Sequence, residues 1–244
     1  MKRLTAIFLI LCLITPCLLS CKNEEKREIK SILFLGDDLM ETSGIFNLFY
    51  KLCKANGHFD ITVDYECIED ARMYTFADLC DKDTEFANRV KKADVIVFEE
   101  GTAETETTAD SITRIINTAN DPVMACLCLY GYPCWMYRED FEEKKLKNIK
   151  YIDADYFIKK IIAAEGTPIG YEHLCLEDYI HPNILNGFLS SVVAYCELFD
   201  TMPEYINLSP FDDHTGIAGC ADVKAGDVSS LVHKLSNMIN DEMK

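Results

Sequence analysis

The sequence predicts an α/β protein with a three-layer α/β/α architecture, in which helices cover both faces of a doubly wound, mostly parallel sheet. Short apolar segments recur roughly every 30 residues with amphipathic helical segments between them, as in parallel strands joined by crossover helices. The 244 residues are 49% hydrophobic, which is enough for one buried core and too little for two large ones. We therefore expect one domain over residues 31–244.

The first half of this domain holds two predicted strand–helix units and a third strand. Residues 31–35 (SILFL) form a fully apolar run closed by Gly36, as expected for a buried parallel strand. Apolar residues at helical spacing begin at Ile45, and Gly57 marks the end of this helix. The remaining elements of this half are a strand at 60–65, a helix at 85–92 and a strand at 93–98.

The second half continues the alternation of strands and helices. We expect a helix at 110–119, a strand at 122–130, a helix at 154–164, a short strand at 168–171, and helices at 182–199 and 228–239. The helix at 182–199 is predicted to start at Pro182, because proline suits the first helical position, where no N–H is needed.

The N-terminal segment has the features of a secretory signal. Two basic residues precede an apolar run at residues 6–19, shorter than the ~20 residues that cross a bilayer. The run ends in Leu-Leu-Ser-Cys, which resembles the lipobox of bacterial lipoproteins. The resemblance implies a signal peptide over 1–20, a lipidated Cys21 and a polar tether over 21–30, anchoring the protein to a bacterial cell membrane, periplasmic or at the cell surface. A plain signal peptide with a chance cysteine, or an uncleaved anchor, would give the same pattern.

The chain is acidic, and its charge excludes one class of partner. It has 24 Lys and Arg against 41 Asp and Glu, a net charge of −17 at pH 7. Such a charge repels phosphate backbones, so we expect no nucleic-acid partner.

The twelve cysteines do not indicate a metal framework. Several lie in apolar runs, such as Cys126 and Cys128, where thiols behave as small hydrophobic groups. The spacings lack the two pairs of a structural zinc site. We expect mostly buried thiols and no resident cofactor, and one or two disulfides of unassigned pairing are the alternative in an exported protein.

Three predicted loops should meet at one edge of the sheet. In doubly wound folds the loops at the carboxyl ends of the strands bind ligands. The first loop holds Gly36-Asp37-Asp38-Leu39, the second Glu99-Glu100-Gly101, and the third, before a late helix, Asp178-Tyr179-Ile180-His181-Pro182-Asn183.

The first and third of these loops resemble motifs of the SGNH, or GDSL, hydrolase superfamily. The likeness rests on an apolar strand running into Gly-Asp-x-Leu at 36–39, and on Asp-x-x-His-Pro-Asn at 178–183, which opens a helix containing Gly187. It spans residues 31 to about 199 and implies a flavodoxin-like sheet and the esterase class. In that family a serine of the first motif attacks the substrate, the late histidine is its base, and the aspartate three residues upstream orients the imidazole.

The resemblance assigns the base to His181 and the orienting carboxylate to Asp178, but the position of the serine holds Asp38. A carboxylate nucleophile would form an acyl anhydride, a poor route for ester hydrolysis at neutral pH. The family's oxyanion donors are altered too, because no glycine lies between residues 58 and 100, and Glu99 follows the third strand, where a carboxylate would repel the oxyanion. We therefore expect a degenerate catalytic motif.

Several carboxylates lie in the three loops that should meet at this edge of the sheet, which we call the rim. They cannot all stay ionised without protons, a basic side chain or a cation. Arg72 is a candidate counter-charge, and a divalent cation is a second hypothesis, for which oxygen ligands and one imidazole suit Ca, Mg or Mn. A degenerate pocket open to water is the third. The candidate binding residues are Asp37, Glu99 and Asn183, and the ligands of any metal stay unknown.

Two further clusters have alternative interpretations. Tyr130, Tyr132, Trp135 and Tyr137 follow the fourth predicted strand and suit either a sugar-stacking platform or a half-buried loop. His214, in an Asp-Asp-His turn, has metal-like spacing but is typical of an ordinary loop.

Three function classes remain open at this point. The first is a catalytically silent membrane-anchored lipoprotein that binds a glycan, peptide or cation. The second is an active esterase or deacetylase on acylated carbohydrate, using His181 with Asp38 or a water. The third is a surface protein without a ligand. The missing serine and Glu99 oppose the esterase, whereas the Asp178 and His181 pair favours it.

Overall fold

The computed structural model describes residues 28–101, 105–129, 133–167, 169–178, 180–208 and 225–242. The predicted signal peptide, Cys21, Tyr130, Tyr132 and His214 therefore lie outside the described residues.

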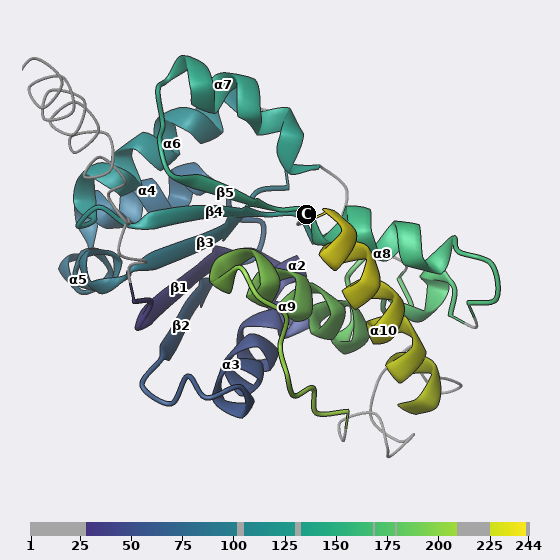
Figure 1. Ribbon diagram of the computed structural model, residues 1–244. Helices are drawn as coiled ribbons and strands as arrows, with labels where there is room; N and C mark the ends of the chain where they lie inside the picture. Colours follow the sequence, from purple (N-terminus) through teal and green to yellow (C-terminus); the bar gives the residue numbers. More distant parts are fainter. Residues whose placement is uncertain are drawn as a thin grey trace, which may run out of the picture.

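Five parallel strands form a sheet in the order β2-β1-β3-β4-β5 (Figure 1). The strands are β1 (Ser31–Gly36), β2 (Thr62–Cys67), β3 (Val95–Glu99), β4 (Val123–Leu127) and β5 (Ile149–Ile152). The chain order reverses between β1 and β3, which creates a switch point where ligands bind in such sheets. The register pairs Leu35 with Phe98, so the chain leaves β1 and β3 side by side.

Helices cover both faces of the sheet, which confirms the predicted three-layer α/β/α fold (Figure 1). One face carries α3 (Ile45–Ala55), α8 (Ala154–Ile162), α9 (Ile184–Phe199) and α10 (Ala225–Glu242); the other carries α4 (Met73–Lys82), α5 (Thr84–Lys92), α6 (Thr105–Thr118) and α7 (Arg138–Glu143). Successive strand residues alternate between the two layers, Ile32 and Phe34 packing on the first and Leu33 and Leu35 on the second. The fully apolar run of β1 is therefore buried on both faces.

Helix α9 packs so closely on the short helix α2 (Asp38–Ser43) that position 187 requires glycine. A Cβ built on Gly187 would lie 1.9 Å from the backbone oxygen of Ser43. Gly44 follows at φ +62°, a conformation suited to glycine, and separates α2 from α3. This contact holds the start of α2 near the loop that precedes α9.

The predicted strand at 168–171 is wrong. Residues 169–170 have no strand structure, and the segment Tyr171–His173 forms a short 3-10 helix, η2. The fifth strand is β5 instead, which pairs with β4 at the sheet edge. Three of its four residues are only partly buried, so the pattern lacks the continuous apolar run of a central parallel strand.

The late helix starts two residues later than predicted, at Ile184. Asn183 is its N-cap, because the side-chain oxygen accepts hydrogen bonds from the backbone N–H groups of Leu185 and Asn186. Pro182 lies before the cap and pairs with Cys175 in an isolated antiparallel bridge.

The described residues hold no helix that is both long and apolar enough to span a bilayer. Their eight cysteines are free, and all but one are buried, in agreement with the expectation of core thiols. These residues are Cys53, Cys67, Cys80, Cys126, Cys128, Cys134, Cys175 and Cys196.

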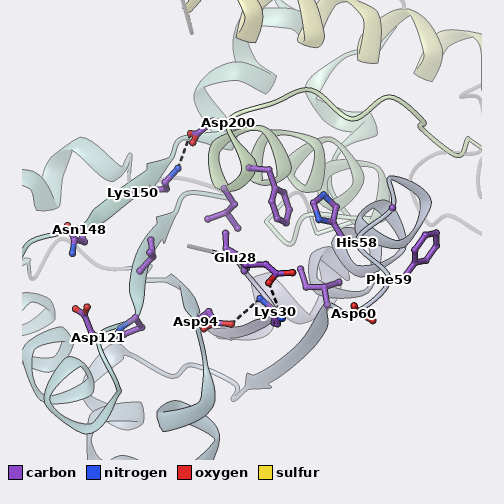
Figure 2. Close-up of a pocket in the computed structure, with 17 residues that line it drawn as sticks. Glu28, Lys30, His58, Phe59, Asp60, Asp94, Asp121, Asn148, Lys150 and Asp200 are labelled. Atoms are coloured by element: carbon purple, nitrogen blue, oxygen red, sulfur yellow. Dashed lines mark hydrogen bonds and ion pairs between the residues drawn. The ribbon is translucent and has the colours of Figure 1, made fainter. Parts of the chain in front are cut away.

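An open pocket of about 1020 Å³ lies at the amino edge of the sheet (Figure 2). It is lined by residues that precede the strands, such as Lys30, Asp94 and Pro122. The Asp94 carboxylate accepts hydrogen bonds from the backbone N–H groups of Lys30 and Ser31, both at 3.0 Å. Sequence reasoning did not identify this pocket, which lies at the opposite edge from the loops expected to hold the site.

Candidate functional site

The first site loop joins β1 to α2. Asp37 is the N-cap of α2, and its Oδ1 accepts a hydrogen bond from the backbone N–H of Leu39 at 2.9 Å. Asp38 is the first residue of the helix. The cap therefore fixes the backbone from which the Asp38 side chain projects.

The third site loop is held closed by its own backbone and by Asn183. The Leu176 N–H donates to the His181 carbonyl at 2.8 Å, and the Asn183 side-chain amide donates to the carbonyls of His173 and Cys175. Asn183 is 1% exposed, so it positions the loop and presents almost no surface to a ligand. Within the loop, Asp178 Oδ1 accepts hydrogen bonds from the N–H groups of residues 180 and 181.

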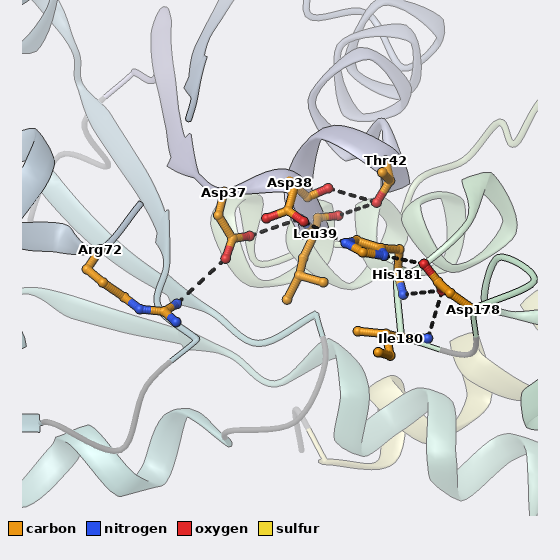
Figure 3. Close-up of polar contacts among 8 residues, drawn as sticks. All are labelled: Asp37, Asp38, Leu39, Thr42, Arg72, Asp178, Ile180 and His181. Carbon is orange, nitrogen blue, oxygen red and sulfur yellow. Dashed lines mark hydrogen bonds and ion pairs between the residues drawn. The ribbon is translucent and has the colours of Figure 1, made fainter. Parts of the chain in front are cut away.

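His181 lies between two carboxylates (Figure 3). Its Nδ1 is 2.5 Å from Asp178 Oδ2, and its Nε2 is 2.6 Å from Asp38 Oδ2. The structure therefore brings together the three residues that sequence reasoning assigned to catalysis. When both carboxylates are ionised they can only accept hydrogen bonds, so each contact then needs a proton on the ring nitrogen. The arrangement favours an imidazolium between two carboxylates.

The pKa shifts follow from this arrangement. Hydrogen bonds to Asp178 and then to Asp38 raise the pKa of His181. Backbone N–H groups and His181 lower the pKa of Asp178 to about 2. Burial alone would raise the pKa of Asp38, but hydrogen bonds from His181 and from the backbone of Asp38 and Asp70 outweigh burial and lower it. The site thus favours the charged form of all three groups.

Asp70 was missed by the sequence analysis. It follows β2 and adopts a left-handed conformation, φ +55°, which aspartate tolerates better than most non-glycine residues. The nearby backbone of Asp70 helps to lower the pKa of the Asp38 carboxyl. In this loop after β2 an aspartate, and not a glycine, takes the left-handed conformation.

Glu99 and Asp37 form a buried acid pair beside the catalytic candidates. Glu99 is 3% exposed and Asp37 is 6% exposed, and Oε2 of Glu99 is buried without a hydrogen-bond partner among the described residues. Burial and the nearby Asp37 raise the pKa of Glu99 well above its usual range, and burial also raises the pKa of Asp37. Both shifts favour protonation of the pair, and the shift of Glu99 is the larger. The raised pKa of Glu99 favours its neutral form, which would not repel an oxyanion as a carboxylate would.

Arg72 supplies the expected counter-charge to this acid pair. Its guanidinium is 3.7 Å from Asp37 (Figure 3) and 3.8 Å from Glu100. A Cβ built on Gly101 would lie 3.0 Å from this guanidinium, so a larger side chain there would crowd Arg72. Glu100 also accepts a hydrogen bond from the backbone N–H of Met73 at 2.8 Å. Arg72 thus links the loops after β1 and β3.

The aromatic cluster separates into exposed and buried parts in the described residues. Trp135 is 65% exposed in the 3-10 helix η1 (Cys134–Tyr137), which follows β4. Tyr137 is buried, and its hydroxyl donates to the Glu100 carbonyl at 2.7 Å. Only Trp135, of these two, presents a ring to solvent.

The metal hypothesis gains no support from the described part of the chain. Within it, no group of three or more His, Cys, Asp or Glu side chains is arranged to hold a metal ion. The carboxylates of the site instead lie against His181 and Arg72, and burial raises the pKa of Glu99.

Comparison with known proteins gives a fold and no family. No protein-family model matches the chain, and a search of curated proteins finds no significant match. Among solved structures, the lipase Lip_vut3 from a goat rumen metagenome has a TM-score of 0.50 and 13% identity, covering 69% of this chain and 97% of the lipase. A protein described as lipolytic and of the G-D-S-L family, from Desulfitobacterium hafniense DCB-2, has a TM-score of 0.46 and 16% identity over 68% of this chain and 97% of its own. TesA has a TM-score of 0.44 and 14% identity over 69% and 98%. The likeness to the lipase shows a shared fold.

Proposed function

We propose that this chain is an exported, lipid-anchored protein with a hydrolase fold that is not a serine esterase and that holds a glycan at its acidic site. The proposal covers the signal peptide at 1–20, lipidation at Cys21 and one SGNH-like domain over 31–244. The fold it shares with the lipase supports the hydrolase ancestry.

One observation supports the proposal that the chain is not a serine esterase. A serine esterase needs a neutral imidazole whose Nε2 accepts the proton of the attacking hydroxyl. Here Nε2 of His181 lies 2.6 Å from the Asp38 carboxyl, and the raised pKa of the ring favours the form in which Nε2 donates to it. Both the hydroxyl and the free base of that mechanism are replaced.

A glycan suits the groups that this site presents. The Asp38 and Asp178 carboxylates accept hydrogen bonds from sugar hydroxyls, and both side chains are partly exposed. Trp135, at the carboxyl edge of the sheet, adds an exposed ring that stacks on sugar faces. A peptide or a cation would use the same carboxylates without the ring.

Hydrolysis of para-nitrophenyl acetate and of acetylated xylan tests the loss of esterase activity. We expect no turnover by the full chain above that of its His181→Ala variant, because neither a hydroxyl nucleophile nor a free base is present. Turnover that His181→Ala abolishes would contradict the proposal.

That outcome would favour the second candidate, an esterase or deacetylase on acylated carbohydrate using His181 with Asp38 or a water. One observation supports it: the 2.5 Å contact between Asp178 and Nδ1 of His181 is the orientation that a catalytic base requires.

Glycan-array binding before and after Trp135→Ala tests the ligand. We expect the substitution to lower binding by about tenfold, corresponding to loss of one stacked ring. Tyr156→Ala is the matched control, since Tyr156 is also exposed but lies on α8. Equal binding by all three proteins would exclude a role for Trp135, and binding to acidic peptides alone would exclude the glycan.

Membrane fractionation of Cys21→Ser tests the anchor. We expect the wild-type chain in the membrane fraction and the variant in the soluble fraction, because the lipid would attach at this thiol. Cys67→Ser serves as the control for loss of a thiol elsewhere. Unchanged fractionation of Cys21→Ser would contradict lipid anchoring.

A further inference from the structure

In the pair of Asp38 and His181, the proton is expected on the opposite partner from that in a serine hydrolase. In the serine mechanism the nucleophile carries the proton and the imidazole takes it. Here the nucleophile position holds a carboxyl group whose pKa is lowered, and Nε2 of His181, a ring whose pKa is raised, lies 2.6 Å from Asp38 Oδ2. A nucleophile that needs no base therefore lies next to a proton donor.

Whether Asp38 and His181 can complete a catalytic cycle depends on the electrophile that the carboxylate attacks. Attack of a carboxylate on an ester carbonyl gives an anhydride, which is more reactive than the ester consumed. Attack on a saturated carbon gives an ordinary ester, which water can hydrolyse with a base and oxyanion donors. A carboxylate in this position is therefore suited to saturated carbon bearing a leaving group.

We propose that Asp38 and His181 open small terminal epoxides through a covalent ester at Asp38. One oxygen of the Asp38 carboxylate bonds to a ring carbon as the carbon–oxygen bond of the epoxide breaks, and Nε2 of His181 gives its proton to the released alkoxide. An epoxide fits because its leaving oxygen needs one proton and stays on the product. The inference rests on the proposed absence of serine-esterase chemistry.

The second step uses the neutral His181 that the first step leaves. Esterification removes the Asp38 charge, so Asp178 alone faces the imidazole, through Nδ1. His181 then takes a proton from water as the water attacks the carbonyl carbon of the ester. The backbone of Asp38 and Asp70, which helps to lower the pKa of the Asp38 carboxyl, would supply the N–H groups that stabilise the oxyanion.

Collapse of that intermediate restores the resting site. The diol oxygen leaves with the proton from His181, and the Asp38 carboxylic acid then returns its own proton to Nε2. The net reaction is epoxide plus water to diol, without an oxidant, a metal or a cofactor.

The reacting groups are accessible to a small substrate. The side chains of Asp38 and His181 are 30% and 28% exposed. Ile180, whose side chain is 55% exposed, belongs to the same loop and supplies an apolar surface (Figure 3). We therefore choose an epoxide with one apolar substituent, styrene oxide, as the probe.

Single-turnover hydrolysis in ¹⁸O-water, with the full chain in excess over styrene oxide, tests the covalent route directly. We expect ¹⁸O in the Asp38 peptide by mass spectrometry and unlabelled oxygen in the diol, because water attacks the protein ester. Asp38→Asn should abolish diol formation, and His181→Gln should lower it by about 10²–10⁴-fold while the alkyl ester accumulates on Asp38. Glu41→Gln, an exposed carboxylate of the same helix, should leave diol formation unchanged.

Three results would overturn the inference: no diol and no Asp38 adduct with the wild-type chain, ¹⁸O in the diol alone, or an adduct spread over surface carboxylates including Glu41. The wild-type measurement does not depend on any variant folding. None of these results bears on the proposed loss of esterase activity, which fails only if esters are hydrolysed through His181.

Discussion

His181 contacts carboxylates from two separate loops, and the ring therefore couples the positions of these loops. The ring joins Asp38 at the start of α2 to Asp178 before α9. Each partner favours the charged form of the others, so the three groups act as one unit. Removing either carboxylate should weaken the proton affinity of the ring.

The unit should stabilise the fold within a defined pH window. The folded pKa of His181 is raised, so its contribution is fully present below its ordinary value of 6.5 and is lost as the pH rises through the folded pKa. The pKa of Asp178 is lowered from 3.8 to about 2, so its contribution is present above 3.8 and is lost as the pH falls toward 2. Urea unfolding across this range should show the difference between wild type and His181→Gln largest between these two ordinary values. A difference that does not vary with pH would contradict the coupling.

Glu99 should oppose folding at high pH. Its folded pKa is raised by burial, so ionisation costs more in the folded than in the unfolded state, and stability falls as the pH rises above its ordinary 4.5. Glu99→Gln keeps a hydrogen-bond donor and removes the titratable proton. We expect thermal unfolding of this variant to depend less on pH above that value, relative to Glu66→Gln, a partly exposed carboxylate, as control. An unchanged slope would show that Glu99 ionises over the same pH range in the folded and unfolded states, and would contradict the raised pKa.

At the scale of elements, the contact of α9 with α2 positions the site. Gly187 allows α9 to approach the end of α2, and the loop before α9 carries His181. A small displacement of either helix would separate Asp38 from His181.

Gly187→Ala should therefore destabilise the fold. The new Cβ would overlap the Ser43 carbonyl, and overpacking of this kind costs about 1–3 kcal/mol or more. Gly226→Ala is the matched control, since nothing lies within 4 Å of a Cβ built at this position of α10, and it should be neutral or stabilise by roughly 0.5–1 kcal/mol. Chemical unfolding measures both. Equal stabilities of the two variants would contradict the close contact.

The elements that sequence reasoning found are those with continuous apolar runs or long amphipathic faces. Strand β1 is buried on both sides and has a continuous apolar run, whereas the edge strand β5 does not and was missed. The helices α2 and α4 were missed too, the first because six residues give too little periodicity.

The candidate site also combines residues that could be predicted from the sequence with features that could not. Asp38, Asp178 and His181 were found because their motifs are local in sequence. The raised pKa values of Asp37 and Glu99 depend on the register of β1 with β3 and on burial, and neither quantity can be obtained from composition or spacing. Likewise, the left-handed backbone of Asp70 carries no glycine to signal it.

At the scale of the whole molecule, the sheet topology accounts for the location of the site. The order reverses between β1 and β3, and the loops after these strands meet there with the loop before α9. The lipase shares this fold, but a fold hosts different chemistries, so the groups at the rim decide the activity. Here those groups are a carboxylate and an imidazolium where a serine mechanism needs a hydroxyl and a free imidazole.

The protonation of His181 at neutral pH is the most direct test of this account. Nitrogen-15 NMR of the histidine rings in the full chain reports whether each ring nitrogen carries a proton. We predict protons on both Nδ1 and Nε2 of His181 in the wild type, and a lower pKa for this ring in Asp38→Asn. A neutral His181 ring in the wild type, with an unprotonated Nε2, would contradict the carboxylate–imidazolium–carboxylate site.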